Sequence, residues 1–351
     1  MTHRSKLVAA LLLIAVSLAA LAGEPQRSVR AQVPAEISLE QALADLKKQT
    51  GNTVEDRRST PTNPRLKLAA KPGEFWKTLD AIGKETGIGF SSYQPDGGVA
   101  LVDKPYRELK THYSGPFRFA VKRVAVTRDD ETQAHTCHVT LDTAWEPRFA
   151  MLYLNLNHAT VAFKKDTEKL DRQTARSVAG VSATEIDLRM KAPPRNAAAV
   201  DSLEGELRVI GAPKMLEFKF AKLVSGQKDE QEGVKVRLTE VKQTAALWAF
   251  EILTEYPKGA LVELESYQSW MDNNRVWLAW TDPKSKRTYE VEPSGEAPQT
   301  SAVGTKIRYY FSVREKMALP PKGVEVVLRY RTPSRVEVFT VPFSFRDLPL
   351  P

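Results

Sequence analysis

Apolar positions follow two different spacings along this chain of 351 residues. Between residues 35 and 105 they recur every three to four positions, as in Leu39, Ala42 and Leu46, which is typical of an amphipathic helix. From Phe117 onward they alternate with polar residues in short runs separated by turn residues, which is typical of β-strands. The pattern predicts a multi-domain, mainly β fold that begins with a small α+β module.

Two helices are expected in this module, and both have recognisable ends. Ser38 can cap the first helix while Gln41 reaches back to it, which is the spacing of a capping box, and Gly51 suits its end. Pro72 suits the first turn of the second helix, and Gly87 suits its end.

The two helical segments also match each other at an offset of 36 residues, which predicts a duplicated βαβ-type unit over residues 35–105. A turn at residues 94–98 between two strand-like runs predicts a closing hairpin. The coinciding pairs are Leu43/Leu79, Leu46/Ile82, Lys48/Lys84, Thr50/Thr86 and Gly51/Gly87.

These residues resemble the short N-terminal domain shared by secretins and TonB-dependent receptors. The similar strings are Ile37-Ser38-Leu39-Glu40-Gln41-Ala42-Leu43, Thr50-Gly51, Trp76-Lys77-Thr78-Leu79 and Thr86-Gly87-Ile88, and the resemblance covers about a fifth of the chain. It implies a periplasmic-type module that engages other proteins and contributes no catalytic residues. The plug and pore segments of those families do not follow it, so the resemblance does not imply transport.

The alternating runs predict two tandem antiparallel β-sandwiches of the Ig-like kind, over residues 112–224 and 231–350. A polar hinge, Ser225 to Gly233, would join them. The two halves end on the same pattern, F-x-F-x-x-L, at Phe218 to Leu223 and at Phe343 to Leu348, which favours a repeat over one large sheet domain.

The N-terminus has the pattern of a secretory signal peptide over residues 1–22. Arg4 and Lys6 precede an uncharged apolar run from Leu7 to Ala22, which is too short to span a bilayer. A polar linker over residues 23–34 would follow. No cysteine lies near the cut to carry a lipid, so we expect a periplasmic or secreted protein with no transmembrane segment in the mature chain.

Charge and composition narrow the classes of partner. The chain has 51 Lys and Arg against 43 Asp and Glu, and the two signs alternate along most of it, which argues against a nucleic-acid partner. The one cysteine, Cys137, excludes an intrachain disulfide and any zinc site that needs two thiolates.

His135 and Cys137 are the strongest metal candidates. On a strand they share one face, whereas His138 faces the other side, so a third ligand such as His112 or His158 would have to come from elsewhere. A buried cysteine beside surface histidines is the simpler interpretation, and no cofactor is predicted. The sequence has no G-x-S-x-G, phosphate-binding glycine loop or H-E-x-x-H motif, so we do not expect an enzyme, and a metal-dependent hydrolase is the third hypothesis.

An aromatic patch in the second sandwich is the remaining candidate site. If Val276, Leu278 and Trp280 face the core, Trp277 lies outside, where it could stack on a sugar or anchor a protein. The alternative is that Trp270 and Trp277 pack under a loop or a neighbouring domain. The candidate binding residues are Trp270, Asn273, Asn274 and Trp277.

The sequence therefore predicts an exported, non-enzymatic binding or scaffold protein of the cell envelope. Strand addition at an exposed sheet edge is the expected mode of binding to an envelope protein. Polysaccharide binding by the aromatic patch is the alternative.

Overall fold

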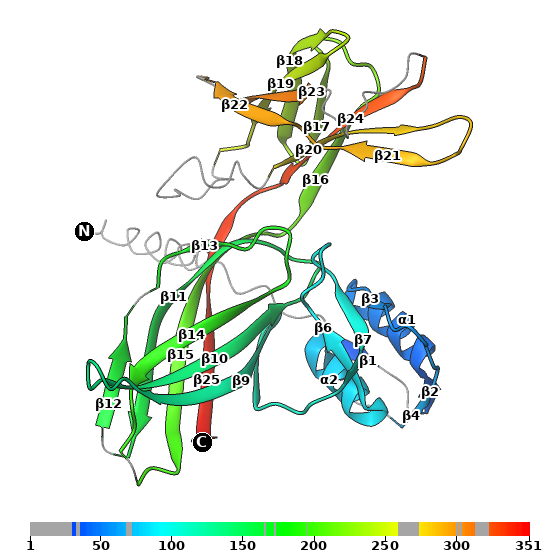
Figure 1. Ribbon diagram of the computed structural model, residues 1–351. Helices are drawn as coiled ribbons and strands as arrows, with labels where there is room; N and C mark the ends of the chain where they lie inside the picture. Colours follow the sequence, from blue (N-terminus) through cyan, green and yellow to red (C-terminus); the bar gives the residue numbers. More distant parts are fainter. Residues whose placement is uncertain are drawn as a thin grey trace, which may run out of the picture.

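The computed structural model describes residues 30–32, 36–67, 72–164, 166–171, 173–194, 196–258, 274–299, 301, 304–312 and 323–351. These residues form a small N-terminal module, a first sandwich and a second sandwich (Figure 1). The mainly β, multi-domain fold expected from the spacing of apolar residues is confirmed. Residues 1–22, which carry the predicted signal peptide, lie outside the described residues.

The module contains two helices of the same length, α1 (Leu39–Thr50) and α2 (Phe75–Thr86). Each is followed by a glycine, Gly51 or Gly87, with a φ of 74° or 71° in the left-handed region that favours this residue. The threonine that ends each helix donates its hydroxyl to the carbonyl four residues earlier. The predicted helices and their C-terminal ends are confirmed.

Short strands surround the helices. One sheet has the order β3-β7-β6, with β3 parallel to β7 and the expected hairpin between β6 and β7, and two further pairs are β1–β5 and β2–β4. The strands are β1 (Arg30–Gln32), β2 (Ile37–Ser38), β3 (Val54–Asp56), β4 (Arg65–Leu66), β5 (Pro72–Glu74), β6 (Ile88–Ser91) and β7 (Val99–Pro105).

Three local expectations for the module are wrong. Pro72 is not in the first turn of α2, because it lies opposite Gln32 in the β1–β5 pair and the helix begins at Phe75. The same pairing places part of the expected linker, Arg30–Gln32, in a strand. Ser38 does accept from the backbone N–H of Gln41 at 3.3 Å, but the Gln41 side chain donates to Asp45, so only half of the capping box forms.

The first sandwich packs two antiparallel sheets around one core. Inward residues such as Val139 and Leu141 alternate with outward ones such as His138, as the period of two requires. One sheet has the order β14-β10-β9-β8: β8 (Thr111–Ser114), β9 (Phe117–Arg128), β10 (His135–Trp145) and β14 (Ala183–Lys191). The other has the order β12-β11-β15-β25, with β13 beside β11: β11 (Ala150–Phe163), β12 (Asp166–Leu170), β13 (Arg176–Ser177), β15 (Ala199–Ala212) and β25 (Glu337–Pro349).

The second sandwich has its own core, which includes Phe218, Phe250, Leu278 and Tyr330. One sheet has the order β16-β24-β20-β21: β16 (Met215–Phe220), β20 (Arg275–Thr281), β21 (Thr288–Val291) and β24 (Val326–Pro333). The other has the order β17-β18-β19-β23-β22: β17 (Lys228–Gln231), β18 (Val234–Gln243), β19 (Leu247–Glu255), β22 (Gly295–Gln299) and β23 (Thr305–Ser312).

The two sandwiches are not consecutive along the chain, which corrects the expected boundaries. β16 pairs with β24 in the second sandwich, whereas the last strand, β25, pairs with β15 in the first. The second sandwich is thus inserted between two neighbouring strands of the first. The two F-x-F patterns, at Phe218 and Phe343, lie in the first strand of one sandwich and the last strand of the other, so they occupy unequal positions.

The expected hinge over residues 225–233 is also wrong, because Lys228–Gln231 is a strand paired with β18 inside the second sandwich. The chain instead crosses between the sandwiches at two places, between β15 and β16 and between β24 and β25 (Figure 1). These crossings are side by side, since the backbone N–H of Ser334 donates to the carbonyl of Lys214 at 2.9 Å.

The module is joined to the first sandwich by buried polar contacts. Arg118 of β9 donates twice to Asp80 of α2, at 2.7 and 3.0 Å, and both side chains are buried. Tyr106 and Tyr113 donate their hydroxyls to the same carboxylate at 3.0 and 2.6 Å. Burial and the Asp80 charge raise the pKa of both phenols. This face of α2 therefore contacts the protein's own sandwich and is not free for another protein.

Candidate functional site

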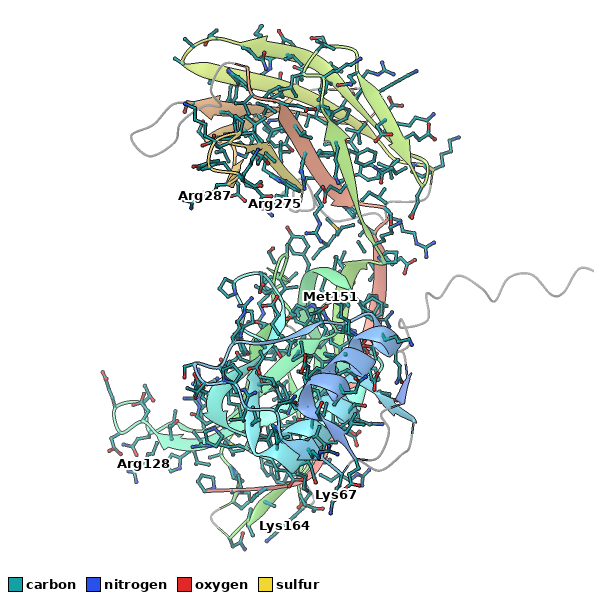
Figure 2. All side chains as sticks on the ribbon, turned by 90° about the vertical axis from the view of Figure 1, so that its right-hand side faces the viewer. Lys67, Arg128, Met151, Lys164, Arg275 and Arg287 are labelled. Carbon is teal, nitrogen blue, oxygen red and sulfur yellow. The ribbon has the colours of Figure 1, made fainter. Side chains whose placement is uncertain are left out.

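Strand β9 is much longer than β8, and the difference leaves one edge of the first sandwich open. β8 pairs with residues 117–120 only, and the last backbone bond between them runs from the Val121 N–H to the Lys110 carbonyl at 2.9 Å. From Arg123 to Arg128, β9 pairs with β10 on one side, and Lys122 is the extra residue of a β-bulge in this pairing. No described strand pairs with the other side of these seven residues. Figure 2 shows Arg128 at the end of a hairpin that projects from the sandwich.

The open edge has apolar side chains on the core side of the sheet. Val124 lies opposite Val139 and Val126 lies opposite Cys137, so each valine shares the face of a fully buried neighbour. Val126 is nevertheless 43% exposed. The edge therefore presents both backbone groups and an incompletely covered apolar row.

A cavity of about 330 Å³ lies against the start of this edge. Its apolar lining comes from Val121 and Val124 of β9 and from Leu348 and Leu350 near the end of the opposite sheet. Because one wall belongs to each sheet, a strand added beside β9 would place its inward side chains between the two sheets.

By contrast, the edge strand at the other side of the same sheet is covered by side chains. The Gln173 amide donates to the Asp187 carbonyl of β14 at 2.7 Å, and Glu168 accepts from the Lys191 N–H at 3.0 Å. Arg176 donates to the Glu185 carbonyl. Such contacts occupy backbone groups that another strand would otherwise use.

Other described edges carry different protection. The edge strand β22 contains Pro298, which has no N–H to donate to an added strand. At the edge strand β16, the Gln231 side chain donates to the Glu217 carbonyl at 2.8 Å and so occupies a backbone acceptor. β8 lies beside β25, where Lys110 donates to the Asp347 carbonyl at 3.0 Å. β12, β17 and β21 have five residues or fewer. No described strand covers the outer side of the seven residues from Lys122 to Arg128, and we define them as the β9 edge.

Basic side chains line the β9 edge. Lys122 pairs with Glu185, and Arg128 pairs with Asp130 at 2.7 Å. Arg123 donates to the hydroxyl of Thr140 at 3.4 Å, a neutral group. The edge therefore has more positive than negative charge.

The predicted metal ligands do not come together. His135 is exposed at the start of β10, whereas Cys137 is fully buried in the core, and burial raises the pKa of its thiol. His112 lies between the rings of Phe119 and Phe345, and His158 is exposed on the opposite sheet. Within the described part of the chain, no three His, Cys, Asp or Glu residues are grouped as a metal site would require.

Of the aromatic patch, the structure describes Trp277 and Asn274, while Trp270 and Asn273 lie outside the described residues. Trp277 points away from the core but is only 4% exposed, as in the alternative that it packs under neighbouring structure. The Arg275 guanidinium lies 4.7 Å from its ring centre. Asn274 faces inward and accepts from Thr332 at 2.6 Å. A covered ring of this kind offers no open face to a sugar.

The sequence does not single out the β9 edge. The alternation that begins at Phe117 predicts a strand here, and that is the signal available. Which residues remain unpaired depends on where β8 begins to pair with β9, at Lys110, and strand alternation carries no information on that point.

No protein-family model matches this chain, and no curated protein matches it either. No helix among the described residues has the length and apolar character needed to cross a membrane.

Proposed function

We propose that this chain is an exported, non-enzymatic binding or scaffold protein of the cell envelope, and that it binds another protein by strand addition to the β9 edge. The observation that carries the proposal is the unpaired stretch from Lys122 to Arg128 beside an apolar cavity. Backbone hydrogen bonds along such an edge supply affinity, and pockets for alternate side chains supply specificity.

Two further features support this function. The uncharged run from Leu7 to Ala22 favours export into the periplasm or the medium. The covered edges of β14, β16 and β22 show that strand pairing is blocked at other places, so the uncovered β9 edge stands apart from them.

The proposal is tested by a photo-crosslinking amino acid at Thr127, an exposed position on the β9 edge. In the producing cell we expect a crosslinked partner in the exported fraction. Val126→Lys should abolish the crosslink, because an inward lysine opposes strand pairing. Val181→Lys is the matched control, since Val181 is also 43% exposed. No crosslink at Thr127, or one that survives Val126→Lys, would contradict strand addition here.

A further inference from the structure

We infer that the segment bound by the β9 edge is an extended peptide in which apolar residues alternate with acidic ones. This inference rests on the proposed function and adds the chemistry of the partner. Three observations carry it: the apolar inward row, the unneutralised charge of Arg123 and the antiparallel pattern of the sheet.

The inward positions of the partner must be apolar. A strand beside β9 directs every second side chain toward the core, where it would cover Val124 and Val126 and contact Leu350 across the cavity. Polar side chains in these positions would lose their hydrogen bonds to water without gaining others.

The outward positions favour a carboxylate because of Arg123, which lies opposite Thr140 on the outward face and donates to its hydroxyl. Among the described residues, no carboxylate lies within ion-pairing distance of Arg123. An acidic residue directly across from Arg123 would form a cross-strand pair of opposite charge.

The expected direction is antiparallel to β9. Both described neighbours of β9, β8 and β10, are antiparallel to it. An antiparallel segment would extend the line of β8 on the N-terminal side of Lys110, where the chain itself has not yet joined the sheet.

The test uses the full exported chain and three labelled nine-residue peptides that alternate valine with glutamate, threonine or lysine. We expect the glutamate peptide to bind about two- to fivefold more tightly than the threonine peptide, in line with the free energy of one cross-strand ion pair, and the lysine peptide to bind least. Hydrogen exchange should slow at residues 122–128. Arg123→Glu should reverse the preference between glutamate and lysine, whereas Lys228→Glu, an exposed change in the second sandwich, should not.

The outcomes separate the two proposals. Equal binding of all three peptides with slowed exchange at residues 122–128 would overturn the acidic preference and keep strand addition. Slowed exchange elsewhere only, or no binding by any peptide together with no crosslink at Thr127, would overturn both. Slowed exchange that depends on protein concentration and needs no peptide would show that a second copy of the chain occupies the edge, which contradicts the peptide partner.

Discussion

Gly211 of β15 lies opposite Glu337 of β25, and the same register continues without a shift into the second sandwich, where Met215 lies opposite Pro333. The bond between Lys214 and Ser334 lies in that register as well. One antiparallel ribbon therefore passes through both sandwiches, and the second sandwich is built on its extension.

This arrangement predicts that the second sandwich can be removed. Replacing residues 213–335 by Asn-Gly would join Ala212 to Val336 with a two-residue turn suited to a hairpin. The core of the first sandwich draws on residues before and after the insertion only. We expect the shortened chain to unfold cooperatively in a thermal melt followed by circular dichroism.

The matched control removes β25 instead, by ending the chain after Arg335. That change takes away Phe339, Val341, Phe343, Phe345 and Leu348, all buried in the first core. At about 1.5 to 3 kcal/mol for each buried side chain, the loss is comparable to the whole stability of a domain. A folded first sandwich without β25, or an unfolded chain after the Asn-Gly replacement, would contradict the insertion.

Local patterns predicted the elements well and their partners poorly. Gly51 and Gly87 marked the ends of α1 and α2 because the residue that follows a helix commonly adopts a left-handed backbone conformation, which favours glycine. Alternation identified the strand around Phe343, but it is the same whether the strand pairs with β15 or with β24, so the chain order suggested the wrong sandwich. The β9 edge is hidden from sequence for the same reason, since it depends on where pairing stops.

The buried pair of Asp80 and Arg118 predicts a large loss on removing one partner. Asp80→Ala leaves a buried guanidinium without its carboxylate, which should cost about 3 to 5 kcal/mol in the free energy of unfolding measured in urea. Glu108→Ala removes the exposed partner of Lys84 and should cost less than about 1 kcal/mol. Similar losses for the two variants would show that the Asp80 contacts do not hold the module in place.

The close approach of Gly97 to Gly180 is a second contact between the module and the first sandwich, and we expect it to be sensitive to substitution. The φ of Gly97, 70°, lies in the left-handed region, and a Cβ atom there would lie 2.4 Å from the Gly180 carbonyl oxygen. Gly97→Ala should therefore lower the melting temperature, with at least about 1 to 2 kcal/mol from backbone strain alone. Gly226→Ala is the control, because its φ of 88° imposes similar strain while no atom lies within 4 Å. Equal effects would indicate that the clash with Gly180 is relieved without cost.

The burial of Cys137 predicts an unreactive thiol. Because the side chain is fully buried and burial raises the pKa of the thiol, the native protein should react with a thiol-specific disulfide reagent far more slowly than the protein in urea. A Val181→Cys variant supplies an exposed thiol that should react at once. Rapid reaction of Cys137 in the native protein would reopen the possibility that it binds a metal together with His135.

The lowered pKa of Glu251 predicts how the stability of the second sandwich responds to acid. Burial by itself would raise the pKa of this carboxyl, but hydrogen bonds from Lys306, Thr239 and Arg308 outweigh that effect and lower the pKa to about 2. The unfolded chain takes up the proton near the usual pKa of 4.5, so the stabilisation is present above that pH and is lost as the pH falls toward 2.

We therefore expect the urea midpoint of the second sandwich to fall between pH 5 and pH 2, and to fall less in Glu251→Gln, which has no carboxylate to protonate. At pH 7 the same variant should be less stable by about 1 to 3 kcal/mol, because two cations lose a charged acceptor. Glu255→Gln controls for the general effect of losing a carboxylate from the same strand, β19. If the wild type and Glu251→Gln lose stability in parallel as the pH falls, other carboxylates account for the acid sensitivity, and the bonds from Lys306 and Arg308 do not control it.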